Sequence, residues 1–182
     1  MFKIIGITGP AQCGKDTVAD HIIKARPAFR KTSFADPIKE MLSAGLGLTS
    51  EQLYGKLKDV IDNRYGCTPR HMLQTLGTEW GRVLIDGNTW VIAMQGYLEE
   101  MGGTFIIPDI RFENEAALVR KYGRLIHIKG REDNIEAGTD HISEKGVKPG
   151  SEDLTIANVH TLDMLYNSAD EALRVIEHDE AF

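Results

Sequence analysis

The sequence predicts an α/β protein in which a parallel sheet is flanked by helices. Three observations support this prediction. A short apolar strand occupies residues 3–8, a glycine-containing loop then opens a helix, and strands alternate with helices again after residue 103. Such alternation is typical of parallel sheets, because each connecting helix returns the chain to the same end of the sheet.

The bulk composition is that of a soluble globular protein. The 182 residues are enough for one compact domain with its own core, and we expect a single domain. Apolar residues make up 42% and charged residues 26%, which favours neither a disordered nor a membrane class. No apolar run approaches the roughly 20 residues that span a bilayer, and Met1 leads into the first strand without a signal-peptide pattern. We therefore expect an intracellular protein.

The net charge disfavours polynucleotide partners, and the cysteine spacing disfavours a cysteine metal site. The formal net charge of −6 disfavours broad attachment to a polynucleotide backbone. Cys13 and Cys67 lie in no cluster with metal-ligand spacing, and we expect both to be free thiols. Cys13 falls inside the glycine-containing loop. Its modification could block that loop, but we favour the interpretation that it only fills a permissive position.

The remaining elements follow in a regular order. Residues 29–34 are expected to form a weak second strand, and Asp36-Pro37 to open a helix that Gly45 and Gly47 end. A helical insertion is expected over about residues 49–100, with its clearest helices at 69–76 and 88–98. The α/β order then resumes with a strand at 104–108, a helix at 113–122, a strand at 124–128, a lid-like loop at about 130–152, an edge strand at 154–159 and a closing helix at 168–177.

The loop at residues 9–17 carries the strongest functional signal. Gly9, Gly14 and Lys15 match the spacing G-x-x-x-x-G-K between a strand and a helix. Glycines let successive backbone N–H groups face a phosphate, the helix start adds partial positive charge, and Lys15 reaches the terminal phosphates. The loop predicts a P-loop NTPase fold and a phosphotransferase. The alternative is a glycine-rich turn that binds nothing.

One position of this loop departs from the usual pattern. Asp16 stands where a Ser or Thr normally follows the lysine, and the hydroxyl arrives one residue later at Thr17. The usual hydroxyl binds Mg²⁺, so the metal ligand stays unassigned; a water-mediated contact and a shifted role for Thr17 are alternatives. A Gly-Lys-x-Thr ending is more similar to small-molecule kinases of the nucleoside monophosphate type than to switch GTPases or motor ATPases.

Phosphoryl transfer also requires cations around the transferred group. The candidates stand in polar positions at the ends of predicted elements: Lys39, Arg70, Arg82, Arg111 and Arg131. For any one of them taken alone, a solvated surface charge is the better interpretation, and spacing does not select among them.

Two further positions allow two interpretations each. Asp109 directly follows an apolar strand, at the edge where open α/β sheets bind ligands, and could bind magnesium or the acceptor; it could equally cap the helix that begins near Phe112. Trp90 could stack on a base, although such a tryptophan more often belongs to the core. The same doubt applies to Trp80.

Several blocks together resemble the bacteriophage deoxynucleoside monophosphate kinase family. They occur in that family's order and cover most of the chain. The blocks are residues 14–17, Ala19-Asp20, Pro37-Ile38-Lys39, residues 70–78, Trp90-Val91, residues 108–111 with Glu115, residues 126–128 and residues 140–144.

The resemblance implies a P-loop kinase fold and transfer of the γ-phosphoryl group from ATP, with Mg²⁺, to a deoxynucleoside 5′-monophosphate. It implies donor-binding residues Gln12, Cys13, Gly14, Lys15, Asp16, Thr17 and Arg131. It implies acceptor-binding residues Lys39, Arg70, Gln74, Gly77, Thr78, Trp90, Asp109, Arg111 and Glu115. Of these, Lys15, Arg70, Asp109 and Arg111 are the expected catalytic residues.

Alternatives remain open at this point. The chain could phosphorylate another small phosphorylated metabolite, or it could be a nucleotide-binding ATPase or regulatory protein. The resemblance implies a phage origin and action in the host cytoplasm. The acceptor base and the formation of a homodimer are not decided by the sequence.

Overall fold

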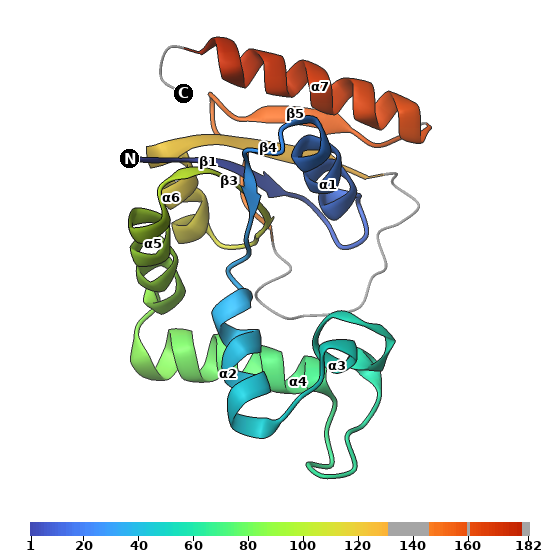
Figure 1. Cartoon of the computed structure of the whole chain (residues 1–182), viewed down its shortest axis with the longest axis vertical. Helices are drawn as coiled ribbons and strands as arrows, with labels where there is room; N and C mark the ends of the chain where they lie inside the picture. The colour runs from blue at the N-terminus through green and yellow to red at the C-terminus, as the bar shows by residue number, and fades with distance from the viewer. Residues whose placement is uncertain (131–145, 160, 180–182) are drawn as a thin grey trace. The chain divides into compact units, whose positions relative to one another are not determined.

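The computed structural model describes residues 1–130, 146–159 and 161–179, which belong to two compact units (Figure 1). The first unit contains residues 1–33 and 95–182, and the second contains residues 34–94. The predicted helical insertion lies mostly in the second unit, which begins earlier and includes α2 (Asp36–Leu46). That the two units behave as one domain stays a prediction.

The first unit is built on a five-stranded sheet of order β2-β3-β1-β4-β5. All four strand pairings are parallel, which confirms the predicted α/β architecture. The weak second strand and the edge strand are both present, although each is shorter than predicted. The strands are β1 (Phe2–Thr8), β2 (Arg30–Lys31), β3 (Gly103–Ile110), β4 (Gly123–Lys129) and β5 (Leu154–Ala157).

Helices cover both faces of this sheet (Figure 1). Helices α1 (Lys15–Ala25) and α7 (Leu162–His178) share one face, where Ile22 and Leu173 join the apolar cluster that includes Ile5 and Ile7 of β1. Helix α6 (Glu113–Tyr122) covers the other face, and its Val119 packs so closely on Gly6 that an added Cβ would lie 2.8 Å away. The alternation of side chains along β1 divides the core between the two faces.

The second unit is helical throughout its regular elements. A π-helix, η2 (Thr75–Ile85), continues directly from α4 (Pro69–Gln74); π-helices are rare and often occur at functional sites. Helix α5 leaves the second unit and enters the first. The further elements are α3 (Ser50–Tyr54), the 3₁₀ helix η1 (Lys56–Asp59) and α5 (Thr89–Met101).

Further predicted boundaries are wrong. Gly45 lies inside α2, and Gly47 alone ends it, with a left-handed φ of 65°. Helix α7 begins at Leu162 rather than residue 168, because the hydroxyl of Thr161 accepts a hydrogen bond from the Met164 N–H at 3.4 Å and caps the helix. Strand β3 extends to Ile110, so Asp109 lies within the strand rather than after it.

Candidate active site

The loop between β1 and α1 depends on two glycines with left-handed backbone. Gly9 has φ 148°, and a Cβ there would lie 2.4 Å from the Ile128 carbonyl oxygen and 2.8 Å from Cys13 Sγ. Gly14 has φ 99° and is the N-cap of α1. Any other residue at these two positions would strain the backbone, and at Gly9 it would also collide with β4. The strand-loop-helix unit predicted from the sequence is therefore present.

The ammonium group of Lys15 folds back into this loop. Its Nζ donates hydrogen bonds to the carbonyl oxygens of Gly9, at 2.8 Å, and Pro10. Burial lowers the pKa of Lys15, and the positive charge of Arg111 lowers it further, against the raising effect of Cys13 and Asp16. Two cations, Lys15 and Arg111, are thus near enough to feel each other's charge. This is an arrangement that a polyphosphate anion would stabilise.

Cys13 is part of the internal packing of the loop. It is 2% exposed, and its carbonyl oxygen accepts a hydrogen bond from Asn158 Nδ2 at 3.0 Å. Burial raises the pKa of its thiol, which favours the neutral and less reactive form. These contacts agree with the interpretation that Cys13 fills a position in the loop.

The end of β3 lies beside the start of the phosphate loop. Thr8, the last residue of β1, donates its hydroxyl hydrogen to the Ile110 carbonyl oxygen at 2.8 Å. Asp109 precedes Ile110 and accepts a hydrogen bond from the Ser33 hydroxyl at 2.9 Å. The carboxylate and the loop therefore share the sheet edge where parallel α/β proteins bind ligands.

Glu115, rather than Asp109, caps helix α6. The cap position is Phe112, and Glu115 Oε2 accepts hydrogen bonds from the backbone N–H groups of Arg111 at 2.7 Å and Phe112 at 3.1 Å. Glu115 is 2% exposed. The interpretation of Asp109 as the cap is wrong, and Glu115 holds the backbone of Arg111 in place. A direct acceptor contact by Glu115 stays a prediction.

In the second unit, two of the predicted cations, Arg70 and Lys39, are engaged by neighbouring side chains. Arg70 Nη2 donates to Asp59 Oδ2 at 2.9 Å, and this hydrogen bond lowers the pKa of Asp59. Lys39 Nζ lies 3.7 Å from Asp36 Oδ1 and 4.1 Å from the centre of the Tyr54 ring. Both side chains have a carboxylate that a bound anion would have to compete with.

The predicted acceptor residues near Gly77 lie on the π-helix and its approach. Gly77 is buried, and a Cβ there would lie 3.1 Å from Ile38 Cδ1, so α2 packs closely on η2. This contact brings the segment containing Lys39 beside the segment containing Gly77. Gln74 and Thr78 are partly exposed.

The structure gives Trp90 a packing role. Trp90 is 4% exposed, its indole N–H donates to the Gly77 carbonyl oxygen at 2.7 Å, and a Cβ at Gly81 would lie 2.6 Å from its ring. Trp80, on the π-helix, is 39% exposed and its ring centre lies 6.3 Å from that of Trp90. A base contact by Trp90 stays a prediction, and the described contacts belong to the core of the unit.

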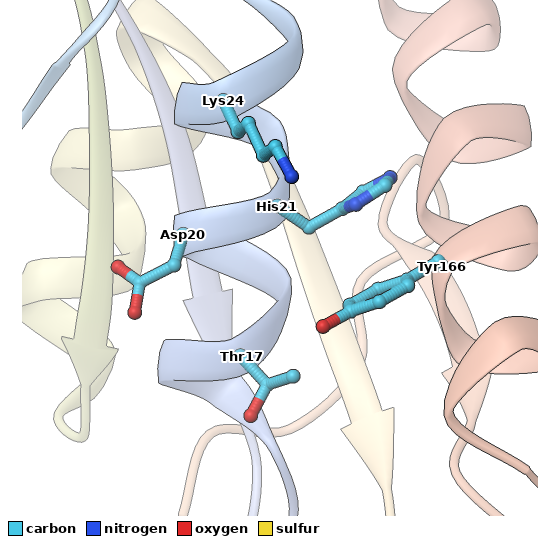
Figure 2. Close-up of a pocket in the computed structure, with 5 residues that line it drawn as sticks. All are labelled: Thr17, Asp20, His21, Lys24 and Tyr166. Atoms are coloured by element: carbon cyan, nitrogen blue, oxygen red, sulfur yellow. The ribbon is translucent and has the colours of Figure 1, made fainter.

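A surface pocket of about 300 Å³ lies along α1 next to the phosphate loop (Figure 2). Four lining residues have the spacing of one helix face, Thr17, Asp20, His21 and Lys24, and Tyr166 of α7 closes the other side. The His21 and Tyr166 rings stack with centroids 4.3 Å apart, and His21 Nε2 lies 2.8 Å from Asp170 Oδ1. Sequence reasoning missed this pocket, although the helical spacing of its α1 residues was visible.

The roles predicted for several other site residues stay predictions. Arg131 and residues 140–144 lie outside the described residues. Gln12 is exposed in the loop, with a left-handed φ of 58°. Among the described residues, no group of three or more histidine, cysteine, aspartate or glutamate side chains is arranged to hold a metal ion.

A phosphate loop at the carboxyl end of a central parallel strand, with helices on both faces of the sheet, defines the class of P-loop phosphotransferases. The chain matches the family model for deoxynucleotide monophosphate kinase over residues 49–169. Together with the relatives below, this match shows that the chain belongs to the deoxynucleotide monophosphate kinase family, as the resemblance in the sequence implied.

Two viral relatives and one solved structure illustrate the similarity. A protein of Acanthamoeba polyphaga mimivirus, provisionally named deoxynucleotide monophosphate kinase, is 31% identical over 90% of this chain and 92% of its own. The deoxynucleoside-5′-monophosphate kinase of Escherichia phage T5 is 27% identical over 81% of this chain and 86% of its own. The dephospho-CoA kinase of Campylobacter jejuni shares the fold, with a TM-score of 0.50, 15% identity, and coverage of 97% of this chain and 98% of that one.

Proposed function

We propose that this protein transfers the γ-phosphoryl group of ATP to a deoxynucleoside 5′-monophosphate, giving ADP and a deoxynucleoside diphosphate. The observation that carries the proposal is the geometry of one sheet edge. Lys15 folds back into the phosphate loop, and β3, which leads directly into Arg111, ends beside the start of that loop through the hydrogen bond from the Thr8 hydroxyl to the Ile110 carbonyl oxygen at 2.8 Å. The membership of the family supports the choice of acceptor.

The roles of the site residues follow from charge and position. Lys15 and the loop amides would hold the donor phosphates, because oriented N–H groups and an ammonium favour an anion at a helix start. Arg111, whose backbone is held by Glu115, would neutralise charge on the transferred group. Arg70 would bind the acceptor phosphate in exchange for its hydrogen bond with Asp59. The nucleophile is the acceptor's own phosphate oxygen, which needs no strong base at neutral pH.

The described residues fit a magnesium ion that is held mainly by the nucleotide. Mg²⁺ prefers hard oxygen ligands and usually retains several waters while bridging phosphates. Asp109 and Ser33 place a carboxylate and a hydroxyl at the sheet edge beside the loop. The Asp16 carboxylate, in contrast, accepts a hydrogen bond from Lys31 Nζ at 2.9 Å. When bound, the ion would offset charge on the donor phosphates, and Asp109 is the side chain we expect to hold it.

We expect the reaction to take place in the cytoplasm with small nucleotides as the partners. In the described part of the chain, no helix is long and apolar enough to cross a bilayer.

An acceptor panel tests the proposal. The purified protein is incubated with ATP, Mg²⁺ and each common deoxynucleoside monophosphate in turn, and the products are separated by ion-exchange chromatography. We expect ADP and the matching diphosphate to form in equal amounts from at least one acceptor.

Two variants serve as controls for the panel. K15M should lower formation of the diphosphate by about 10³-fold, and K121M, which removes an exposed lysine of helix α6, should leave it intact. ADP formation at a rate that no acceptor changes would contradict the proposal and point to an ATPase.

A further inference from the structure

An acidic residue directly follows the lysine of the phosphate loop. The Asp16 side chain is 80% exposed, in the first turn of α1, and its Oδ1 accepts a hydrogen bond from Lys31 Nζ at 2.9 Å. Lys31 also donates to Asp20 Oδ1, one helical turn further on, at 2.8 Å. One lysine of strand β2 therefore holds two carboxylates of the helix that begins at the phosphate loop.

Lys31 is well placed for this role. Its backbone pairs with Ile106 in β3, and the following Thr32 N–H donates to the Ile106 carbonyl oxygen at 3.1 Å, so the strand fixes the start of the side chain. Burial would lower the pKa of Lys31, but the hydrogen bonds to Asp20 and Asp16 outweigh it and raise the pKa above 10.5. The ammonium is therefore charged throughout the neutral pH range.

The negative charge of Asp16 acts on the same space as the donor phosphates. Asp16 is close enough to Lys15 to raise the pKa of that ammonium, although burial has the larger, opposite effect. A carboxylate that stabilises the charge on Lys15 also repels a polyphosphate bound to Lys15, since both interactions follow from Coulomb's law. An unpaired Asp16 would weaken the anion site.

We propose that Lys31 is a positioning residue for the donor: it keeps the Asp16 carboxylate turned towards β2 and offsets its charge, so that the loop retains its affinity for ATP. The inference rests on the proposed function only in assuming that this loop binds the phosphates of ATP. It gives a reason why an acidic residue is tolerated next to the loop lysine.

ATP binding measured by titration calorimetry, without an acceptor, tests the inference. K31M should raise the dissociation constant about five-fold, and K31R, which keeps the charge, should stay within about two-fold of the unaltered protein. In steady-state assays the same change should appear in KM for ATP while kcat is retained. The K31M effect should shrink as salt rises from about 0.05 M to about 0.5 M, because screening shortens the reach of Asp16.

Two double variants separate the proposed role of Lys31, which is to position Asp16 and offset its charge, from a role that only links β2 to α1. D16N/K31M should bind ATP within about two-fold of the unaltered protein, because the repelling charge is gone. D20N/K31M makes the same change of charge at the second partner of Lys31, one turn further from Lys15, and should remain as weak as K31M. A structural tie between β2 and α1 would be lost equally in both.

The possible results test the role of Lys31 and the proposed kinase function separately. An unchanged dissociation constant in K31M, or equal recovery in the two double variants, overturns the role of Lys31 while leaving a working kinase. A Lys31 effect on ATP binding in a protein that phosphorylates no acceptor overturns the kinase proposal alone. If the unaltered protein binds no ATP, both are overturned.

Discussion

Two ion-pair networks in the sheet-containing unit use the same kinds of side chain in different surroundings. Beside the phosphate loop, Lys31 pairs with Asp16, whose side chain is 80% exposed. Between β4, α6 and the start of β5, Arg120 and His127 meet Asp153, whose side chain is 3% exposed. The first network lies beside a predicted anion site, and the second is enclosed in the protein.

The enclosed carboxylate of Asp153 has hydrogen-bond partners for most of its acceptor capacity. Asp153 Oδ2 accepts hydrogen bonds from Arg120 Nη2 at 2.7 Å and from the Gly150 N–H at 2.7 Å, and lies 2.9 Å from His127 Nε2. Exposed ion pairs contribute little to stability because water competes for both charges. Removing one member of a buried network leaves its partners unsatisfied and costs much more. We therefore expect the Asp16 network to control ligand binding and the Asp153 network to control folding.

The largest expected effect is the loss of Lys15. K15M should lower kcat/KM by about 10³-fold, or about 4 kcal/mol of transition-state stabilisation, because the ammonium no longer meets the donor phosphates. Its melting temperature should change little. Steady-state kinetics and thermal unfolding of the same samples check both. A K15M protein with normal kcat/KM would contradict the assignment of the loop as the donor site.

Replacing Asp153 should lower stability and leave catalysis unchanged, the reverse of the result expected for K15M. D153N should lower the free energy of unfolding by about 3 kcal/mol, because Arg120 and His127 lose a buried charged partner. Urea unfolding measures this loss, and kcat per folded molecule should be retained. The matched control is E152Q, since Glu152 is 78% exposed and 3.7 Å from Arg124; it should cost less than about 0.5 kcal/mol. Equal losses in the two variants would remove the distinction between the networks.

Acid should weaken the Asp153 network in a defined pH range. Burial would raise the pKa of Asp153, but hydrogen bonds from Arg120, Gly150 and His127 outweigh it and lower the pKa to about 2 from 3.8. A lowered pKa in the folded state stabilises the protein above pH 4, and this contribution is lost as the pH falls from about 4 to about 2.

The expected loss over that range is about 2 kcal/mol in the unaltered protein, and it should be absent from D153N. Chemical unfolding at a series of pH values from about 2 to about 6 measures it. Parallel curves for the two proteins would show that Asp153 has an ordinary pKa in the folded state.

The smallest effect concerns the stability of the exposed network. K31M should change the free energy of unfolding by less than about 1 kcal/mol, because the Asp16 and Asp20 carboxylates become fully hydrated when the lysine is lost. Thermal unfolding of K31M beside the unaltered protein measures the change. A loss as large as that of D153N would mean that Lys31 is a structural residue.

Features that depend on neighbouring residues were the most predictable from the sequence. The first strand, the phosphate loop and helix 113–122 were predicted because strand alternation, glycine positions and helical spacing act over a few residues. The start of α7 was missed because the cap at Thr161 lies outside the periodic apolar pattern. Asp109 was assigned to the correct sheet edge. That Glu115 rather than Asp109 caps helix α6 was visible only in the contact of Glu115 with the Arg111 backbone, and a ligand role for Asp109 stays a prediction.

Features built by residues far apart in the chain were not predictable. The pocket is closed by Tyr166 of α7, and His21, which lines it, contacts Asp170 of the same helix across 149 positions of the chain. The helix spacing in the sequence indicates only the α1 side of the pocket. Trp90 shows the same limit, since its sequence context fits both a base contact and a packed ring. The contact between its indole N–H and the Gly77 carbonyl oxygen exists only after the π-helix and α5 have packed together.

The sequence by itself determined that a lysine follows a glycine loop between a strand and a helix, and that Asp16 stands beside that lysine. These facts follow from chain neighbours and local backbone preference. Only the tertiary structure decided the partners of the two carboxylates: Lys31 for Asp16, and Arg120 with His127 for Asp153. An ion pair depends on distance and exposure, and both are set by the packing of strands and helices rather than by position in the chain.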